Sequence, residues 1–377
     1  MKYFLIAGEA SGDWHAAHLM EALKQRDPGA RFAFAGGDKM QAAGGTAPVV
    51  HYREMAYMGL WDVLTHLPAI RRNFRLVKEH IRRFAPDTVI LVDYPGFNLR
   101  MAKWAKQQGY KVVYYISPKL WAWKEGRVEI IRRYVDKMLL ILPFEVEFYR
   151  RHGIDAVYVG NPVVEETAAH RPPAREEFLR RNGLDDKPLV ALLPGSRRQE
   201  IKYMLPVMMQ LPPAFPQFRF VVAGAPSLEP EIYTRYGLRA GVPLIQNQTY
   251  DLLAHAHLAV VTSGTATLET ALFGVPQVVG YRTQPWQYHL GKHLVKVPYF
   301  SLVNLILGRE AVPELLQDRF DARRIGRLLQ ALDRGDARDR MLADYARLRE
   351  VLQDRKASET AAGEIIRLLR TPAGEHR

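Results

Sequence analysis

The stretch Leu258-Ala259-Val260-Val261-Thr262-Ser263-Gly264-Thr265-Ala266-Thr267-Leu268-Glu269 predicts an apolar strand, a turn and the start of a helix. We expect the helix to end at Gly274 and another strand to follow over 277–281. Such a turn presents backbone N–H groups and hydroxyls at a helix N-terminus, where they suit an anion such as a phosphate. Glu269 lies about one turn into the helix, so its carboxylate can reach hydroxyls beside that anion. The segment favours a nucleotide-sugar site, and simple capping by its hydroxyl side chains is the alternative.

The same alternation of apolar strands and helices continues on both sides of this segment. Strands are expected at 3–7, 31–35, 88–92, 111–116 and 138–142, with a short apolar run at 157–159, and then at 189–193, 219–223, 258–261 and 277–281. Strands that alternate with helices predict parallel, doubly wound sheets. The fold class is therefore α/β, with two facing Rossmann-like domains and a cleft between them.

Chain length and proline content suggest where the domains divide. A chain of 377 residues is too long for one ordinary core. The stretch 165–188 is polar and interrupted by prolines, and the chain is charged and helical from Asp318 onward. We expect a first domain over 1–165, a second over 166–345, and a helical tail over 346–377 that packs back on the first domain.

Composition excludes several classes of protein. The absence of cysteine excludes disulfides, thiol nucleophiles and cysteine-ligated zinc, and fits a cytosolic protein. No apolar run approaches the ~18 residues of a membrane span, and the apolar start is too short for a signal peptide. The net charge of +13 suits nucleic acid, an anionic membrane surface or phosphorylated substrates.

Part of this charge lies on a predicted helix over 67–84. Its apolar positions recur at helical spacing, and basic residues, among them Arg71, Arg72 and Arg75, occupy most of the remainder. Such a helix can lie on a membrane surface, or it can pack its apolar stripe on its own domain. Just before it, Met58 and Trp61 belong to an apolar cluster that suits either acyl chains or the domain core.

Four motifs follow predicted strands, at the edge where open α/β sheets bind ligands. They are the segments 8–13, 93–98, 117–123 and 194–197. The first has neither the terminal Gly-Lys of a P-loop nor the spacing of a dinucleotide fingerprint. Asp93 is the candidate general base, because a carboxylate among aromatic residues at a strand end is partly desolvated; a turn-forming role is the alternative. Arg197 follows a Gly-Ser turn and can neutralise a diphosphate.

The histidines give no sign of a metal site. They occur in pairs by spacing alone, without H-E-x-x-H or an evident carboxylate third ligand. We expect no metal.

Together these motifs resemble the lipid-A-disaccharide synthase family, inverting glycosyltransferases of family 19 with the two-domain GT-B architecture. The similar stretches are 8–13, 58–59, 93–98, 117–123, 142–145, 193–197 with Glu200, 263–269, 279–282, 301–304 and 308–310. One departure is Asn161, where many members of the family carry a histidine.

The resemblance implies a reaction. The family joins UDP-2,3-diacylglucosamine to 2,3-diacylglucosamine 1-phosphate and forms a β-1,6-linked tetraacyl disaccharide 1-phosphate and UDP. By analogy the first domain holds the acceptor and the second holds UDP. No cofactor is implied, and GT-B enzymes generally work without a divalent metal. The acylated substrates imply a cytoplasmic protein that docks peripherally on the anionic inner face of the membrane.

The resemblance also suggests roles for individual residues. Asp93 matches the aspartate proposed as base for the acceptor 6-hydroxyl, and Arg197, Glu269 and Asn304 match positions associated with the nucleotide or its diphosphate. The residues expected to bind the UDP-sugar are Gly195, Ser196, Arg197, Ser263, Gly264, Thr265, Glu269 and Asn304. Ser11, Gly12 and Asp13 are expected to form an acceptor or phosphate loop, and Met58, Trp61, Arg71, Arg72 and Arg75 to contact acyl chains or the membrane.

Two other functions remain open at this stage. One is a different GT-B enzyme that uses UDP-GlcNAc, either a transferase with a non-lipid acceptor or an epimerase. The other is a basic module that binds nucleic acid, although no recognised nucleic-acid motif or aromatic stacking platform accompanies the arginines.

Overall fold

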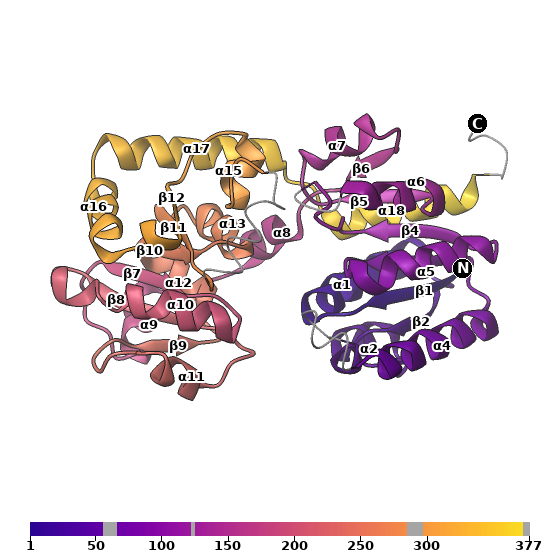
Figure 1. The fold of residues 1–377 in the computed structure, drawn as a ribbon, viewed down its shortest axis with the longest axis horizontal. Helices are drawn as coiled ribbons and strands as arrows, with labels where there is room; N and C mark the ends of the chain where they lie inside the picture. Colours follow the sequence, from indigo (N-terminus) through magenta and orange to yellow (C-terminus); the bar gives the residue numbers. More distant parts are fainter. Residues whose placement is uncertain (56–65, 122–124, 285–296, 372–377) are drawn as a thin grey trace. The chain divides into compact units, whose positions relative to one another are not determined.

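The computed structural model of the chain describes residues 1–55, 66–121, 125–284 and 297–371 (Figure 1). The chain forms two compact units. Unit 1 comprises Met1–Pro162 and Arg355–Arg377, and unit 2 comprises Val163–Asp354. Each unit is built on one parallel sheet with helices packed against it.

Unit 1 contains a six-stranded sheet in the order β2-β1-β3-β4-β5-β6, and its neighbouring strands pair in parallel. The strands are β1 (Lys2–Ala7), β2 (Arg31–Ala35), β3 (Thr88–Val92), β4 (Lys111–Tyr115), β5 (Lys137–Leu140) and β6 (Ala156–Tyr158). The chain order reverses at β1, which has β2 on one side and β3 on the other. Open α/β sheets bind ligands beyond the carboxyl ends of the strands at such a switch point.

Two hydrophobic cores cover the faces of this sheet. The helices are α1 (Ala10–Arg26), α2 (Asp38–Gly44), α4 (Leu67–Phe84), α5 (Pro95–Gln107), α6 (Val128–Tyr134), α7 (Glu145–Arg151) and α18 (Ala357–Arg370), with α8 (Pro162–Ala169) leading into unit 2 and short 3-10 turns η1 (Tyr52–Glu54) and η2 (Glu125–Arg127). Tyr3 and Leu5 join the core that contains α1 and α18, whereas Phe4 and Ile6 join the core that contains α4 and α5. This alternation follows from the two-residue period of a strand, and both faces of β1 are therefore apolar.

Helix α18 returns from the end of the chain to unit 1. It packs against α1, and Ile365 is completely buried in the shared core. The chain re-enters unit 1 beside β6, where Arg355 donates to the carbonyl oxygen of Tyr158 at 3.2 Å. Gly160 has φ +109°, and a Cβ there would lie 2.5 Å from the Arg355 carbonyl oxygen. Only glycine fits this close approach, so the point where the chain leaves unit 1 is packed against the point where it returns.

Unit 2 has a second six-stranded parallel sheet, in the order β12-β11-β10-β7-β8-β9. The strands are β7 (Leu189–Leu193), β8 (Arg219–Gly224), β9 (Leu244–Gln246), β10 (Ala256–Thr262), β11 (Gln277–Tyr281) and β12 (Glu314–Leu316). The helices are α9 (Arg175–Arg181), α10 (Arg198–Met208), α11 (Pro230–Arg235), α12 (Thr249–His255), α13 (Thr265–Leu272), α15 (Leu302–Leu307), α16 (Ala322–Asp333) and α17 (Asp336–Leu352), with 3-10 turns η3 (Pro212–Ala214) and η4 (Gln317–Arg319).

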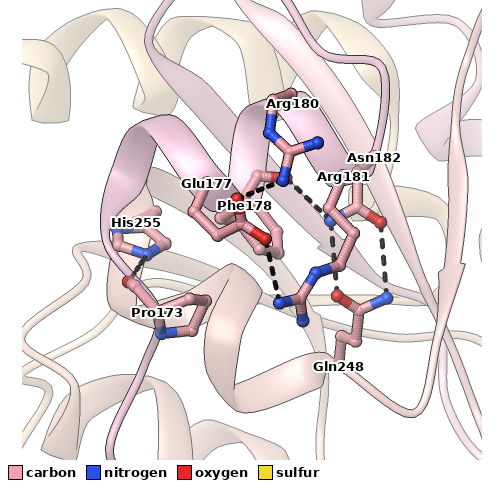
Figure 2. Close-up of polar contacts among 8 residues, drawn as sticks. All are labelled: Pro173, Glu177, Phe178, Arg180, Arg181, Asn182, Gln248 and His255. Carbon is pink, nitrogen blue, oxygen red and sulfur yellow. Dashed lines mark hydrogen bonds and ion pairs between the residues drawn. The ribbon is translucent and has the colours of Figure 1, made fainter.

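Figure 2 shows how α9 is anchored within unit 2. Asn182, just after the helix, donates to the carbonyl oxygen of Phe178 at 2.9 Å and exchanges two amide hydrogen bonds of 3.3 Å with Gln248. At the other end of the helix, a ring nitrogen of His255 lies 2.9 Å from the carbonyl oxygen of Pro173. These contacts join the connecting segment to the two ends of α12, so this histidine and this amide pair serve the fold.

The predicted alternation of strands and helices is confirmed, and the helix predicted over 67–84 coincides with α4. Strands β9 and β12 were not predicted, because each has three residues and lies at a sheet edge, where little apolar sequence is required. The apolar stripe of α4 packs on its own unit: Val77 and Ile81 are buried in the core. The arginines Arg71, Arg72 and Arg75 are exposed.

Candidate active site

Asp93 lies directly after β3, at the carboxyl edge of the unit 1 sheet. Both Asp93 (φ +44°) and Tyr94 (φ +48°) adopt the left-handed conformation, which costs on the order of 1 kcal/mol or more for a residue with a Cβ. Hydrogen bonds hold this turn in place: the carbonyl oxygen of Asp93 accepts from the Tyr114 hydroxyl at 2.6 Å and from the Asn98 side chain at 2.8 Å. Backbone strain that is maintained by such contacts is typical of functional positions. The same contacts fix the backbone from which the Asp93 carboxylate extends.

Tyr94 explains the first glycine of the segment 8–13. A Cβ at Gly8 would lie 2.2 Å from the Tyr94 ring, so only glycine lets the ring lie against the end of β1. The Tyr94 hydroxyl donates to the carbonyl oxygen of Met55 at 2.5 Å. The ring is therefore held between the end of β1 and the segment that ends at Met55.

The surroundings of Asp93 favour a proton acceptor that works near neutral pH. Burial, and then the negative charge of Glu9 after β1, raise the pKa of Asp93 to about 6, against an opposing effect from the positive charge of Lys119 after β4. A carboxylate with this pKa is ionised at pH 7 and yet basic enough to accept a proton in a reaction. Among the predicted site residues, Asp93 has the environment that a general base requires.

A second buried acid, Glu145, was not predicted to have a chemical role. It begins α7 and is 1% exposed, and the Trp121 indole donates to one of its oxygens at 2.9 Å. Burial raises the pKa of Glu145 to about 8, so its carboxyl group is protonated at neutral pH. Nearby, the Ser117 hydroxyl lies 2.7 Å from the Tyr149 hydroxyl. This cluster anchors the segment after β4 at both ends. An acid placed directly after a buried strand and an apolar turn was the available sequence signal.

The predicted loop of Ser11, Gly12 and Asp13 forms the first turn of α1. The Asp13 carboxylate is 2% exposed and accepts from the backbone N–H groups of Gly37 (2.6 Å), Lys39 (3.0 Å) and Met40 (3.2 Å). It therefore caps the N-terminus of α2, a structural role. Ser11 is exposed and Gly12 is buried, so Ser11 is the member of this loop that faces solvent.

In unit 2, the turn Gly195-Ser196-Arg197 follows β7, and two of its backbone N–H groups are hydrogen-bonded to a nearby side chain. Glu200 accepts from the N–H groups of Ser196 (2.9 Å) and Arg197 (3.2 Å), as in a capping box. Gly195 has φ +112°, and a Cβ there would lie 2.4 Å from the Glu200 carboxylate. The backbone of this turn thus serves the start of α10, while the exposed Arg197 guanidinium is the group that reaches outward.

The turn before α13 differs from the turn before α10, because no side chain accepts a hydrogen bond from its backbone in the described part of the chain. The Thr267 N–H donates to the carbonyl oxygen of Gly264 at 3.2 Å, so the N–H groups before it are the ones that could face an anion. The Ser263 hydroxyl instead donates to the carbonyl oxygen of Phe300 at 2.7 Å. Gly264 and Thr265 lie at the helix start, and Thr265 is exposed. The capping hydrogen bonds of the alternative interpretation are therefore not found at this helix start in the described part of the chain.

Glu269 lies further along α13 in a partly buried position. Burial, and then the negative charge of Glu166, raise the pKa of Glu269 to about 7. Tyr250 lies between the two carboxyl groups, and its hydroxyl donates to Glu166 at 3.4 Å. A carboxyl group with this pKa can either accept or donate a hydrogen bond near neutral pH, which suits the hydroxyls of a ribose.

Asn304 is buried and uses both ends of its amide within unit 2. Its oxygen accepts from the N–H groups of Ala311 (2.7 Å) and Val312 (2.9 Å), and its nitrogen donates to Val312 and to Glu314. Glu314 also accepts from the N–H groups of Phe300 (2.8 Å) and Ser301 (2.9 Å). Asn304 and Glu314 therefore fix the segment that Ser263 contacts. Sequence reasoning missed Glu314 because its hydrogen bonds to Phe300, Ser301 and Asn304 depend on how the chain folds back and follow no helical or strand spacing.

The other predicted positions are Met58, Trp61 and Asn161. Met58 and Trp61 lie outside the described residues. Asn161 stands where many members of the family carry a histidine. It is buried in unit 1, and its side chain donates to the carbonyl oxygen of Ile141 at 2.9 Å. Within the described ranges, no cluster of three or more side chains could hold a metal ion, and no helix is long and apolar enough to cross a membrane.

Comparison with known proteins places these motifs in one family. The sequence model of the lipid-A-disaccharide synthetase family matches residues 3–366. The chain is 41% identical to the lipid-A-disaccharide synthase of Myxococcus xanthus over 376 residues, with 98% of this chain and 97% of the relative covered. It is 38% identical to that of Koribacter versatilis over 374 residues, with 97% of each covered.

Solved structures share the fold at low sequence identity. UDP-GlcNAc 2-epimerase from Neisseria meningitidis, bound to UDP-GlcNAc, aligns with a TM-score of 0.62 at 14% identity, covering 98% of this chain and 99% of that one. The calicheamicin glycosyltransferase CalG4 aligns with a TM-score of 0.60 at 18% identity, covering 97% and 98%. Two parallel α/β units of this kind constitute the predicted GT-B fold, which is confirmed.

Proposed function

Because this chain belongs to the lipid-A-disaccharide synthetase family, we propose that its units carry out the corresponding sugar transfer. The chain is a hexosyltransferase of lipid A biosynthesis. It joins UDP-2,3-diacylglucosamine to 2,3-diacylglucosamine 1-phosphate and forms the β-1,6-linked disaccharide 1-phosphate and UDP. We assign the acceptor to unit 1 and the UDP-sugar to unit 2.

The partly buried, strained Asp93 is the observation that carries the assignment of the acceptor. In the proposed step, the acceptor O6 attacks C1 of the donor sugar, the C1–O bond to the diphosphate breaks, and Asp93 accepts the proton from O6. Attack from the face opposite the departing UDP inverts C1 and gives the β-linkage. A pKa of about 6 lets Asp93 begin the step ionised and end it protonated.

On the donor side, the departing diphosphate needs positive charge and hydrogen-bond donors. We assign this role to the Arg197 guanidinium and to the uncapped start of α13, at Gly264 and Thr265. Ser263 and Asn304 support the site by fixing the segment around Phe300. We assign the ribose hydroxyls to Glu269.

The acylated substrates require access to a membrane surface. We propose that the exposed arginines Arg71, Arg72 and Arg75 of α4 dock the protein peripherally on the anionic inner face of the cytoplasmic membrane. The apolar stripe of α4 is used by the core, so these side chains provide attraction to headgroups rather than insertion. Met58 and Trp61 remain candidates for contact with acyl chains.

The test is UDP release from UDP-2,3-diacylglucosamine in detergent micelles, with and without 2,3-diacylglucosamine 1-phosphate, before and after EDTA treatment. We expect release that depends on the acceptor, a disaccharide product, and no loss with EDTA. Turnover of plain UDP-GlcNAc without acceptor would instead indicate an epimerase, and a strict metal requirement would contradict stabilisation of the diphosphate by protein groups alone.

A further inference from the structure

The segment after β4 is a rigid platform at the same sheet edge as Asp93. Its start is held by the Ser117 hydroxyl against Tyr149, and its end by the Trp121 indole on the buried Glu145. Leu120, between these anchors, is 3% exposed. These two anchors fix the backbone at Lys119, so the point from which its side chain extends is set by the fold.

Lys119 is exposed, although its neighbours on the platform are buried. No ion pair to its ammonium group occurs among the described residues, whereas many of the exposed basic side chains of unit 1 pair with a carboxylate, as Arg72 does with Glu54. Its charge nevertheless acts on the partly buried Asp93 and the buried Glu145, since it lowers the pKa of each against the effect of burial. The structure thus places an uncommitted cation near the proposed base.

Strand pairing explains this proximity. Strands β3 and β4 are neighbours with Val92 opposite Tyr115, and the Asp93 N–H donates to the Tyr115 carbonyl oxygen at 3.0 Å. The platform begins two residues after Tyr115. Asp93 and Lys119 therefore leave adjacent strands at the same edge of the sheet, within one rigid unit.

We propose that Lys119 binds the anomeric phosphate of the acceptor and makes the enzyme select a phosphorylated sugar, an inference that rests on the proposed function. In a glucosamine 1-phosphate, the carbons that bear the phosphate (C1) and the 6-hydroxymethyl group (C5) both flank the ring oxygen. The acyl groups on C2 and C3 lie on the opposite edge of the ring. A base that holds O6 therefore has the phosphate beside it, where an ammonium group can neutralise it.

The experiment compares Lys119→Met, which removes the charge, with Lys119→Arg, which keeps it. Lys103→Met is the matched control, because Lys103 is an exposed lysine of the same unit, on α5. Initial rates are measured in neutral detergent micelles at saturating donor, with 2,3-diacylglucosamine carrying or lacking the 1-phosphate. Calorimetry gives the UDP affinity of each variant. The neutral micelles remove any contribution from anionic lipid.

We expect Lys119→Met to raise KM for the phosphorylated acceptor about tenfold or more, since hydrogen bonds between charged groups are worth at least that factor. Its kcat should remain within about threefold, because no reacting atom is lost. The turnover of the acceptor without phosphate should change much less. Lys119→Arg should recover most of the affinity, and Lys103→Met should behave as wild type.

Three outcomes would overturn the assignment. Equal losses with both acceptors would show that Lys119 acts on the base or the fold rather than on the phosphate. Weaker UDP binding by Lys119→Met would show that Lys119 binds the donor diphosphate instead. Unchanged kinetics would show that Lys119 has no role in the reaction. A wild-type protein that transfers to no acceptor would refute the proposed function itself, which separates that failure from the others.

Discussion

Asp93 is the residue on which the proposed chemistry depends, and its replacement by asparagine gives the first prediction. The amide preserves the size of the side chain but cannot accept a proton, so turnover should fall by about 10²- to 10⁴-fold. The affinity for UDP should stay within about twofold of wild type, because UDP is assigned to unit 2. Asp155→Asn, at a side chain that is 88% exposed, is the control. Near-normal turnover of Asp93→Asn would reject the base assignment.

The pH dependence of kcat/KM tests the same residue independently. Asp93 acts when it is ionised, so kcat/KM should rise with pH through about 6, the raised pKa of its carboxyl group. Glu9→Gln removes the neighbouring negative charge and should move this rise to lower pH. A rise near pH 4 in the wild-type enzyme would show that the pKa of Asp93 is not raised, and a rise that Glu9→Gln leaves in place would show that a group other than Asp93 is being titrated.

Glu145 gives a prediction for stability rather than rate. Its pKa is about 8 in the folded protein and about 4.5 when unfolded, so the folded state retains a proton that the unfolded state releases. The stabilising contribution is complete below about pH 4.5 and is lost as the pH rises towards 8. Glu145→Gln keeps an acceptor for the Trp121 indole without this titration. Its free energy of unfolding, from urea denaturation, should change less than that of wild type between pH 5 and 8; parallel curves would contradict the assignment.

At the residue scale, the sequence located the groups whose position depends only on local order along the chain. Asp93 and the start of α13 could be identified because each directly follows an apolar strand. The hydrogen bonds of Asp13, Asn304 and Glu314 could not be predicted, since their partners are set by the packing of the chain and not by spacing along it. Asp13 and Asn304 were expected at ligands; in the structure the Asp13 carboxylate accepts from backbone N–H groups, and the Asn304 amide bonds to backbone and to the Glu314 carboxylate.

At the scale of elements, α4 shows that its sequence pattern predicted the helix but not what its apolar side and its basic side contact. Its spacing predicted the helix correctly, but only packing could decide where the apolar stripe lies, and it lies in the core of unit 1. The basic face remains exposed. A binary pattern of apolar and basic residues thus determines an element and its two faces without identifying what each face contacts.

The basic face of α4 should matter for membrane binding. Replacement of Arg71 and Arg75 by glutamate reverses two charges, and each basic residue near an anionic surface contributes about 1 kcal/mol. Partitioning onto vesicles that contain phosphatidylglycerol should fall at least tenfold, as measured by co-sedimentation. The control is Arg323→Glu with Arg327→Glu on α16, which makes the same change in net charge at exposed positions. Equal losses in both proteins would indicate attraction by net charge alone.

At the scale of the whole molecule, unit 1 depends on a helix from the far end of the chain. Ile365→Ala removes a completely buried side chain from the core that α18 shares with α1, at a cost of about 2–5 kcal/mol. Calorimetry should show a lower melting temperature for unit 1, while UDP binding by unit 2 persists. Leu76→Ala, at a 38% exposed position, should have little effect. Loss of UDP binding by Ile365→Ala would show that the units do not fold independently.

The return of α18 also has a consequence for how the protein is made. Unit 2 is one continuous segment, Val163–Asp354, which the ribosome delivers complete before the last helix emerges. Unit 1 is synthesised first, yet it lacks one side of a core until Ala357–Arg370 leaves the exit tunnel. Domains ordinarily mature in the order of translation. We therefore expect unit 1, although it is synthesised before unit 2, to finish folding after it, and to expose an apolar face that chaperones can bind until α18 docks.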